Sequence, residues 1–326
     1  MNNRIYLVLP PNIMRRVREV ITARFPEASL HAPDIHAEMF SFATDFGKGH
    51  LPALTVSAYP QIVLHAEKLA AEGRFAEPAT SLPPLRDEFG SLGMTPPVSV
   101  LRIVAVVPGI FAAATSLKHR LEDWDDLLAP DFPAPIGCPP HDTPLPYLAR
   151  AVFTAMAGER AEDVLAKLDT RSNPIDINKR IASGALPMAL LIPAFARTFR
   201  SGTGHTGRGC MVWPKSGALA VPLMACLAAD AAPVANEILA YLFSDEFQRS
   251  IAADGGIAPV VPGVPGFEEL EESGWNFFWP GWECIRSVAK AMCVANIRPE
   301  IAKDVSEPGM AHARILRDAQ VENGHL

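Results

Sequence analysis

Two long, largely apolar segments constrain the fold of this 326-residue chain most strongly. They are Val98–Val107, which ends at Pro108-Gly109, and Leu219–Leu227. Each is longer than the strand that one small α/β lobe needs, and a complete α/β unit lies between them. We therefore expect the two segments to lie side by side as connections between two lobes, with residues 1–107 plus 219–326 in the first lobe and residues 108–218 in the second.

Short apolar runs alternate with amphipathic helices elsewhere in the chain. Ile5–Leu9 and Leu54–Ser57 are typical of buried strands. A helix capped by Asn12 follows the first run, and a helix that starts at Pro60 follows the second. A further helix, capped by Asp142 or Thr143, is predicted to end at Gly158. This alternation favours an α/β fold with a mainly parallel sheet.

Composition and charge exclude several classes of partner. The formal net charge is -7, so the chain lacks the basic surface that nucleic acid or an anionic membrane attracts. No apolar run approaches the ~18–20 residues that cross a bilayer. The five apolar residues Ile5–Leu9 are too few for a signal peptide. We therefore expect no nucleic-acid partner, no membrane insertion, and a cytoplasmic location for the sequence as written, or a periplasmic one if its N-terminus was trimmed.

The cysteines indicate a reducing compartment. Their number is odd and no C-x-x-C pair occurs, so a disulfide framework is not indicated. We expect all five to be unpaired, namely Cys138, Cys210, Cys226, Cys284 and Cys293.

Four segments in a fixed order resemble one known family. They are Trp124–Leu128 with Ala134–Gly137, Ile177–Gly184, Trp213–Leu223, and Phe243–Gln248 followed by Gly255–Val260. Their order and spacing are similar to those of extracellular solute-binding proteins of ABC transporters, in the subgroup for ferric iron, polyamines and 2-aminophosphonate. The resemblance implies a type II periplasmic-binding-protein fold, in which two crossover strands join two α/β lobes and a small-molecule solute is held between them. It also implies an ABC permease as partner.

The turns at the carboxyl ends of the strands are the candidate ligand site. Helix N-termini at Asn12, Ser57 and Thr143 would present N–H groups to an anion. Aromatic side chains would add flat walls, and His141 would add charge, whereas an Asp142 that faces the cleft would favour a cation such as a polyamine. We predict a small polar, anionic solute and the contact residues Asn12, Ser57, Tyr59, His141, Asp142, Thr143, Phe195 and Trp213.

No metal or other cofactor is expected. Potential metal ligands occur together at Cys138, His141 and Asp142, with His205 and Cys210 as further candidates, but they lack the close pairs of a zinc site. Ferric-binding relatives generally use tyrosines, often adjacent, so the resemblance argues against ferric ion here, because no two of the four tyrosines are neighbours: Tyr6, Tyr59, Tyr147 and Tyr241. Gly202–Gly207 matches G-x-G-x-x-G but lies between a predicted helix and a strand, which indicates a surface loop.

No catalytic constellation stands out, so a binding protein is favoured over an enzyme. Two alternatives remain: a cytoplasmic cofactor-biosynthesis enzyme with the same fold, and a ligand-sensing regulatory protein, although no helix-turn-helix accompanies it. A dense aromatic cluster is expected to pack in the core of the first lobe rather than to contact a partner, and it comprises Trp275, Phe277, Phe278, Trp279 and Trp282.

Overall fold

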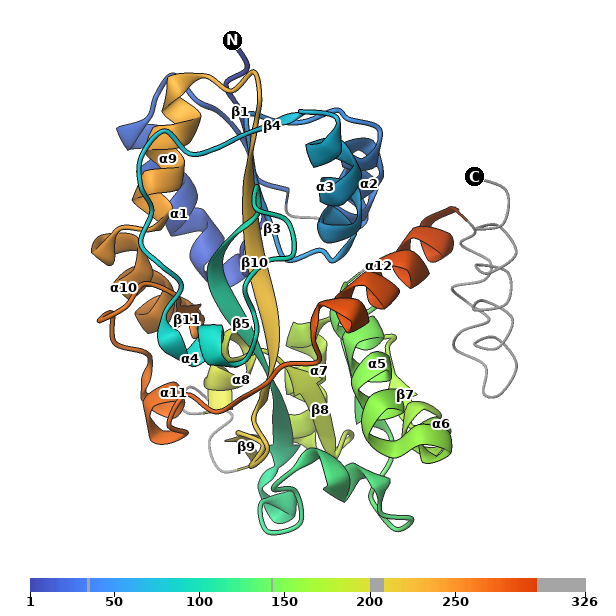
Figure 1. The fold of residues 1–326 in the computed structure, drawn as a ribbon. Helices are drawn as coiled ribbons and strands as arrows, with labels where there is room; N and C mark the ends of the chain where they lie inside the picture. Colours follow the sequence, from blue (N-terminus) through green and yellow to red (C-terminus); the bar gives the residue numbers. More distant parts are fainter. Residues whose placement is uncertain (34–35, 142, 200–207, 298–326) are drawn as a thin grey trace.

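The computed structural model describes residues 1–33, 36–141, 143–199 and 208–297. It shows two α/β lobes, one above the other in Figure 1, that are joined by two long strands. The first lobe contains β1–β4 and the second contains β6–β9. The strands are β1 (Arg4–Leu7), β2 (Ser29–His31), β3 (Leu54–Ser57), β4 (Phe75–Ala76), β5 (Arg102–Ala114), β6 (Ile136–Gly137), β7 (Leu168–Asp169), β8 (Met188–Leu191), β9 (Gly209–Val212), β10 (Ala218–Ala228), β11 (Ala258–Pro259) and β12 (Phe277–Phe278).

The sheet is mixed, because the two connecting strands run against their neighbours. The order of its main path is β2-β1-β3-β10-β5-β8-β6-β7. Pairing is parallel within each lobe, between β1 and its neighbours and between β6 and its neighbours. It is antiparallel wherever β5 or β10 takes part, except that β10 is parallel to β12. The two connecting strands carry the chain in opposite directions between the lobes, which explains the antiparallel centre.

The predicted side-by-side placement of the two apolar segments is confirmed. β10 pairs with β5 from Leu219↔Gly109 to Ala225↔Arg102. The prediction that the first segment ends at Pro108-Gly109 is wrong, because β5 continues to Ala114 and pairs there with β8 and β9. Gly109 serves close packing rather than a chain break, since a Cβ at this position would lie 3.1 Å from Leu219 Cβ.

The helices cover both faces of the strands. In the first lobe, α1, α9 and α10 lie on one side and α2 and α3 on the other (Figure 1). The bounds are α1 (Pro11–Arg24), α2 (His36–Gly47), α3 (Gln61–Ala71), α4 (Asp87–Ser91), α5 (Leu145–Ala157), α6 (Ala161–Leu165), α7 (Pro174–Ser183), α8 (Pro193–Ala196), α9 (Pro233–Leu242), α10 (Asp245–Gly255), α11 (Glu268–Glu272) and α12 (Trp282–Ile297), with 3-10 turns at Thr115–Leu117, Trp124–Leu128, Gly158–Arg160 and Arg197–Phe199.

Helix α12 contacts both lobes. It packs against α3 of the first lobe and against α5 of the second, and Figure 1 shows it between them. Its Arg286 forms an ion pair with Glu67 of α3. The C-terminal part of the described chain is therefore a further contact between the lobes, in addition to β5 and β10.

Prolines, rather than the predicted polar residues, cap the two helices α1 and α5. The residue before α1 is Pro10 and the residue before α5 is Pro144, and neither helix has a side-chain cap. Asn12 lies inside the first turn of α1, where its amide donates to the Asp254 carbonyl over 2.7 Å. A proline costs little at these positions because the first-turn N–H groups have no partner within the helix.

Phe277 of the C-terminal aromatic cluster packs in the core as predicted, whereas the other four members are only half-buried: Trp275, Phe278, Trp279 and Trp282. Phe277 is buried, and its ring centroid lies 5.3 Å from that of Phe89 in α4. Arg86 stacks over Trp275 at 3.6 Å from the ring centroid. These contacts fasten the segment around β12 to the body of the lobe.

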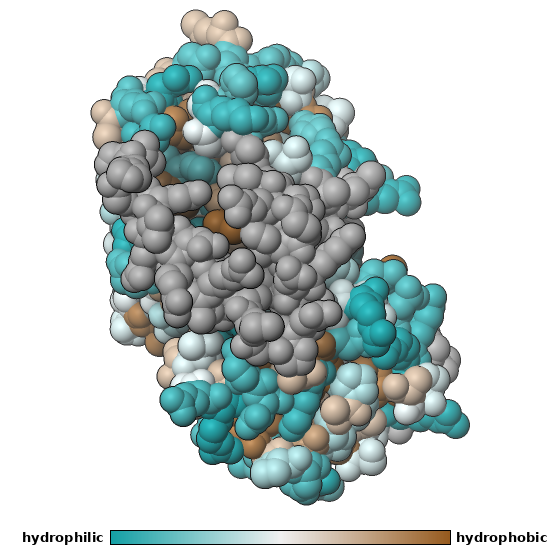
Figure 2. Space-filling model, turned by 90° about the vertical axis from the view of Figure 1, so that its right-hand side faces the viewer, coloured by the Kyte–Doolittle hydropathy of each residue, from teal (hydrophilic) through white to brown (hydrophobic). Residues whose placement is uncertain are grey.

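The described surface is largely polar. Figure 2 shows hydrophilic residues over most of the coloured part of one face, with apolar residues scattered among them. The large apolar side chains that are exposed among the described residues are Met1, Leu92 and Ile175. Within the same residues, no helix combines the length and hydropathy that crossing a bilayer requires.

The cysteines provide a test of the redox state. The structure forms no disulfide among the five, and Cys138 and Cys226 are fully buried. Burial raises the pKa of the Cys226 thiol to about 12 and also raises that of Cys138, so both remain thiols at neutral pH. We expect thiol titration to find five free thiols in denaturant, whereas these two should be unreactive in the native protein. Fewer than five, restored to five by a reductant, would contradict this expectation.

Asp169, at the end of β7, makes stability depend on pH. Its buried carboxylate accepts hydrogen bonds from Arg171 Nε (2.8 Å) and Arg180 Nη1 (2.9 Å). Hydrogen bonding from Arg171 is the largest cause that holds its pKa well below the usual range. The folded pKa lies below the unfolded one, so this stabilisation is present above the unfolded pKa of ~3.9 and is lost as pH falls further.

We therefore expect Asp169→Asn to lower the free energy of unfolding at pH 7 by about 2 kcal/mol, and by about 1 kcal/mol less near pH 3. Urea unfolding at both pH values measures the difference. Asp131→Asn is the control, because Asp131 forms an exposed ion pair with Arg120 and should have a small effect at either pH. An Asp169→Asn effect that does not change with pH would contradict the assignment.

Candidate functional site

A cavity of about 220 Å³ lies between the two lobes, beside the strands that join them. The first lobe contributes residues that follow β1 and β3, the second lobe contributes the starts of α5, α7 and α8, and β5 and β10 form the wall at the hinge. The lining residues are Val8, Leu9, Pro10, Met14, Pro33, Met39, Ala58, Tyr59, Val107, Pro139, Thr143, Pro144, Leu145, Leu148, Pro174, Ile192, Phe195, Val221 and Leu223.

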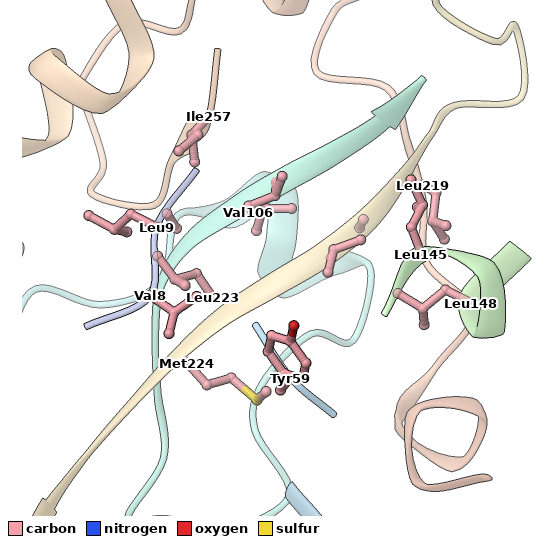
Figure 3. Close-up of a cluster of buried hydrophobic side chains, with 14 of the residues drawn as sticks. Val8, Leu9, Tyr59, Val106, Leu145, Leu148, Leu219, Leu223, Met224 and Ile257 are labelled. Carbon is pink, nitrogen blue, oxygen red and sulfur yellow. The ribbon is translucent and has the colours of Figure 1, made fainter. Parts of the chain in front are cut away.

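Figure 3 shows how the two lobes face each other here. Val8 and Leu9, which follow β1, lie near Leu223 of β10. Leu145 and Leu148 project from α5 on the other side, and the Tyr59 ring lies between the two groups in this view. Since lining atoms come from both lobes and from both connecting strands, any rotation of one lobe against the other changes the shape of the cavity.

The lining is almost entirely apolar. Its described residues include no arginine, lysine, histidine, aspartate or glutamate. Its polar side chains are Tyr59 and Thr143, one from each lobe. The Thr143 hydroxyl donates to the Pro140 carbonyl over 2.7 Å, and the Tyr59 hydroxyl lies 3.8 Å from Met39 Sδ. The Thr143 hydroxyl therefore already has a protein acceptor for its hydrogen.

Prolines remove backbone donors from this lining. Five of the lining residues are proline, and a proline has no N–H. Pro10 and Pro144 directly precede α1 and α5, and Pro174 is the first residue of α7. Each of these three helix starts therefore has one N–H group fewer to offer to an anion and presents a pyrrolidine ring to the cavity.

The structure brings together three of the predicted contact residues. Tyr59, Thr143 and Phe195 line the cavity. Asn12 and Ser57 do not, because their polar groups serve the protein itself: the Asn12 amide binds the Asp254 carbonyl, and Ser57 Oγ accepts from the Tyr59 N–H at 3.1 Å. The first of these bonds holds α1 to α10, and the second shapes the turn that follows β3.

The remaining predicted contact residues lie elsewhere or outside the description. The His141 ring lies edge-on to the Tyr147 ring, 5.8 Å between centroids, and is absent from the lining. Trp213 donates its indole N–H to the Asn276 carbonyl and packs against Phe277, on the segment of the C-terminal aromatic cluster. Asp142 lies outside the described residues, as does the Gly202–Gly207 motif.

The apolar part of the cavity lining was not predicted from the sequence. The predicted contacts were hydroxyls, amides and charges at the strand ends, whereas most of the lining is proline, leucine, valine and methionine. A signal was available: 31 prolines, many of them at the junctions where strands lead into helices. Those junctions are the cleft-facing positions of an open α/β fold, so prolines there predict a cleft with few backbone donors.

Metal ligands do not gather in the described structure. Among its residues, no group of three His, Cys, Asp or Glu side chains is placed to hold a metal ion. Cys138 is fully buried, His205 and Asp142 are not described, and Tyr59 is the only tyrosine in the cavity lining. Tyr6 is buried in the first lobe, stacked on Phe42, and burial raises its pKa.

Comparisons with solved structures show the same fold. The apo ferric ion-binding protein A of Pasteurella haemolytica superimposes with a TM-score of 0.69 at 10% identity, covering 95% of this chain and 100% of that one. The ferric binding protein of Campylobacter jejuni gives 0.68 at 13% identity, with 93% and 98% covered. Iron-bound HitA from Pseudomonas aeruginosa gives 0.67 at 16% identity, with 93% and 99% covered. This confirms the predicted two-lobe, type II periplasmic-binding-protein fold.

Comparison of the sequence assigns the family. No curated protein sequence matches the chain. The family model described as bacterial extracellular solute-binding protein matches residues 64–288, which is more than half of the chain and includes both connecting strands. The chain therefore belongs to the bacterial extracellular solute-binding protein family.

Proposed function

We propose that this protein captures its solute in the cavity at the hinge and releases it when the lobes separate. Solute binding for ABC transport is the function of its family, so a small-molecule ligand and an ABC permease are its partners. The observation that supports the position of the site is the lining itself, which combines both lobes with Val107 of β5 and with Val221 and Leu223 of β10.

The division into lobes supports a closing motion. β5 pairs with β10 up to Gly109 and with β8 from Ile110 onward. We infer that the lobes are residues 1–107 plus 219–326 and residues 108–218, and that they rotate about this exchange of partners. Hinge closure around a ligand is a common motion of two-lobe binding proteins.

The family is extracellular, and that membership supports a periplasmic site of action. The sequence-based expectation of a cytoplasmic location has no support from the family. In the periplasm, the protein would bind solute in this cavity, and its closed form would then bind the permease. The enzymatic alternative gains nothing from the site, because the described lining holds no carboxylate, imidazole or thiol.

Native mass spectrometry tests the proposal directly. Protein purified without denaturation should carry a small molecule that is absent after unfolding, and adding that molecule back should raise Tm and reduce the radius of gyration. Ala58→Trp, which places an indole at the cavity wall, should abolish both responses. Ala232→Trp is the matched control, because Ala232 is equally half-buried but precedes α9, away from the cavity. Retention of the ligand by Ala58→Trp would contradict this site.

A further inference from the structure

We propose that the hinge cavity selects an uncharged, mainly apolar organic solute about the size of a substituted benzene ring. This inference rests on the proposed function and goes further by naming the ligand class. It departs from the anionic solute that the sequence predicts, because the lining does not supply what an anion requires.

The first property is charge. Among the described residues, those that line the cavity between the lobes provide no cationic or anionic side chain. An ion transferred there from water loses its hydration without gaining a counter-charge, which is strongly unfavourable. A ferric ion would need several anionic or nitrogen ligands, and the lining offers one phenol. Charged solutes of either sign are therefore disfavoured.

The second property is the scarcity of hydrogen-bond donors. Pro10, Pro144 and Pro174 each remove one N–H group at a helix start that reaches the cavity. The Thr143 hydroxyl already donates its hydrogen to the Pro140 carbonyl. A polyhydroxylated, zwitterionic or phosphorylated solute would leave most of its polar groups unpaired, at about 1–3 kcal/mol for each. A mainly apolar solute can bind in this cavity without such a penalty.

The third property is the size and shape of the cavity. A dry apolar cavity of about 150 Å³ is sufficient to bind benzene. The volume here is about 220 Å³, which leaves room for a ring with one or two substituents or for a branched aliphatic chain of similar bulk. Tyr59 and Phe195 reach the cavity from the first and second lobe, so two aromatic rings are available to contact a flat solute.

A series of probes with one ring and different charges tests the proposal. Toluene, benzyl alcohol, benzoate and benzylammonium have the same phenyl group, so charge is the main variable. We expect toluene and benzyl alcohol to bind, raising Tm in proportion to the logarithm of their concentration, and the two ions to bind at least tenfold more weakly by calorimetry. Ala58→Trp should abolish binding of the neutral probes, and Ala232→Trp should retain it.

Other outcomes separate this inference from the proposed function. If benzoate, spermidine or ferric citrate binds more tightly than the neutral probes, and Ala58→Trp abolishes that binding, the ligand class is wrong while the site stands. If neutral probes bind equally well to wild type and Ala58→Trp, they occupy another place and the ligand class is overturned. If no probe binds and no small molecule accompanies the purified protein, both proposals fail.

Discussion

Replacing Gln248 by leucine should lower the free energy of unfolding by about 3–5 kcal/mol. This glutamine of α10 is fully buried. Its amide nitrogen donates to the carbonyls of Val104 (2.9 Å) and Leu242 (2.7 Å), and its amide oxygen accepts from the Val260 N–H (2.8 Å). Leucine fills a similar volume but leaves buried backbone groups without these bonds, at about 1–3 kcal/mol for each group.

The position of Val104 makes this bond important to β5. The register between β5 and β10 shifts at Leu223/Met224, so Val104 has no paired residue on β10. Gln248 supplies a donor at that irregularity and ties α10 to the strand. Chemical denaturation followed by circular dichroism measures the loss.

Gln61→Leu is the matched control. Gln61 is also buried, but neither its amide nitrogen nor its amide oxygen has a hydrogen-bond partner in the described structure. Its replacement should leave stability unchanged or raise it, since a buried polar group without partners is unfavourable. Equal effects of the two substitutions would contradict this interpretation of Gln248.

Replacing Trp124 by alanine should cost about 3–5 kcal/mol of unfolding free energy. The indole is completely buried in the second lobe, with its ring centroid 4.6 Å from that of Phe111 in β5. Its N–H donates to the Gly217 carbonyl over 2.9 Å, in the turn that enters β10. The side chain therefore joins the two connecting strands, and its loss leaves a large cavity beside them.

Trp124→Phe separates packing from hydrogen bonding. It keeps an aromatic ring against Phe111 but removes the donor to Gly217, so we expect about 1–3 kcal/mol. Trp279→Ala is the control, because Trp279 is half-buried and its ring lies edge-on to that of Trp282, 5.0 Å between centroids. Equilibrium unfolding of the three variants should rank them Trp124→Ala, Trp124→Phe, Trp279→Ala in decreasing effect. A Trp279→Ala loss equal to that of Trp124→Ala would contradict this ranking.

Helices and strands were predicted well from the sequence where the local pattern and the tertiary packing favour the same structure. β3 has the predicted bounds Leu54–Ser57, and Gly158 lies just past α5, as predicted. β5 was predicted too short because Pro108 and Gly109 commonly end strands. Here the buried contact between β5 and β10 outweighs that local preference.

The sequence predicted three of the residues that line the cavity, but it did not predict the apolar chemistry of the lining. The strand ends that the fold places in the cleft include Tyr59, Thr143 and Phe195, and all three line the cavity. Their polar neighbours were assigned to the ligand because the sequence does not specify which way a side chain points. Ser57 illustrates this, since its hydroxyl binds the Tyr59 N–H and therefore turns away from any solute.

Helix α12 has a mechanical consequence. Two adjacent strands resist bending poorly and allow both a swing and a twist between the bodies they join. A strut set apart from them opposes the twist, so the relative motion is reduced to a swing about a single axis. Arg286 pairs α12 with Glu67 of α3, so we expect the strut to travel with the first lobe and to slide over α5. Helix α5 also contributes Leu145 and Leu148 to the cavity lining, so a solute that enters the cavity should change the contact between α5 and the strut.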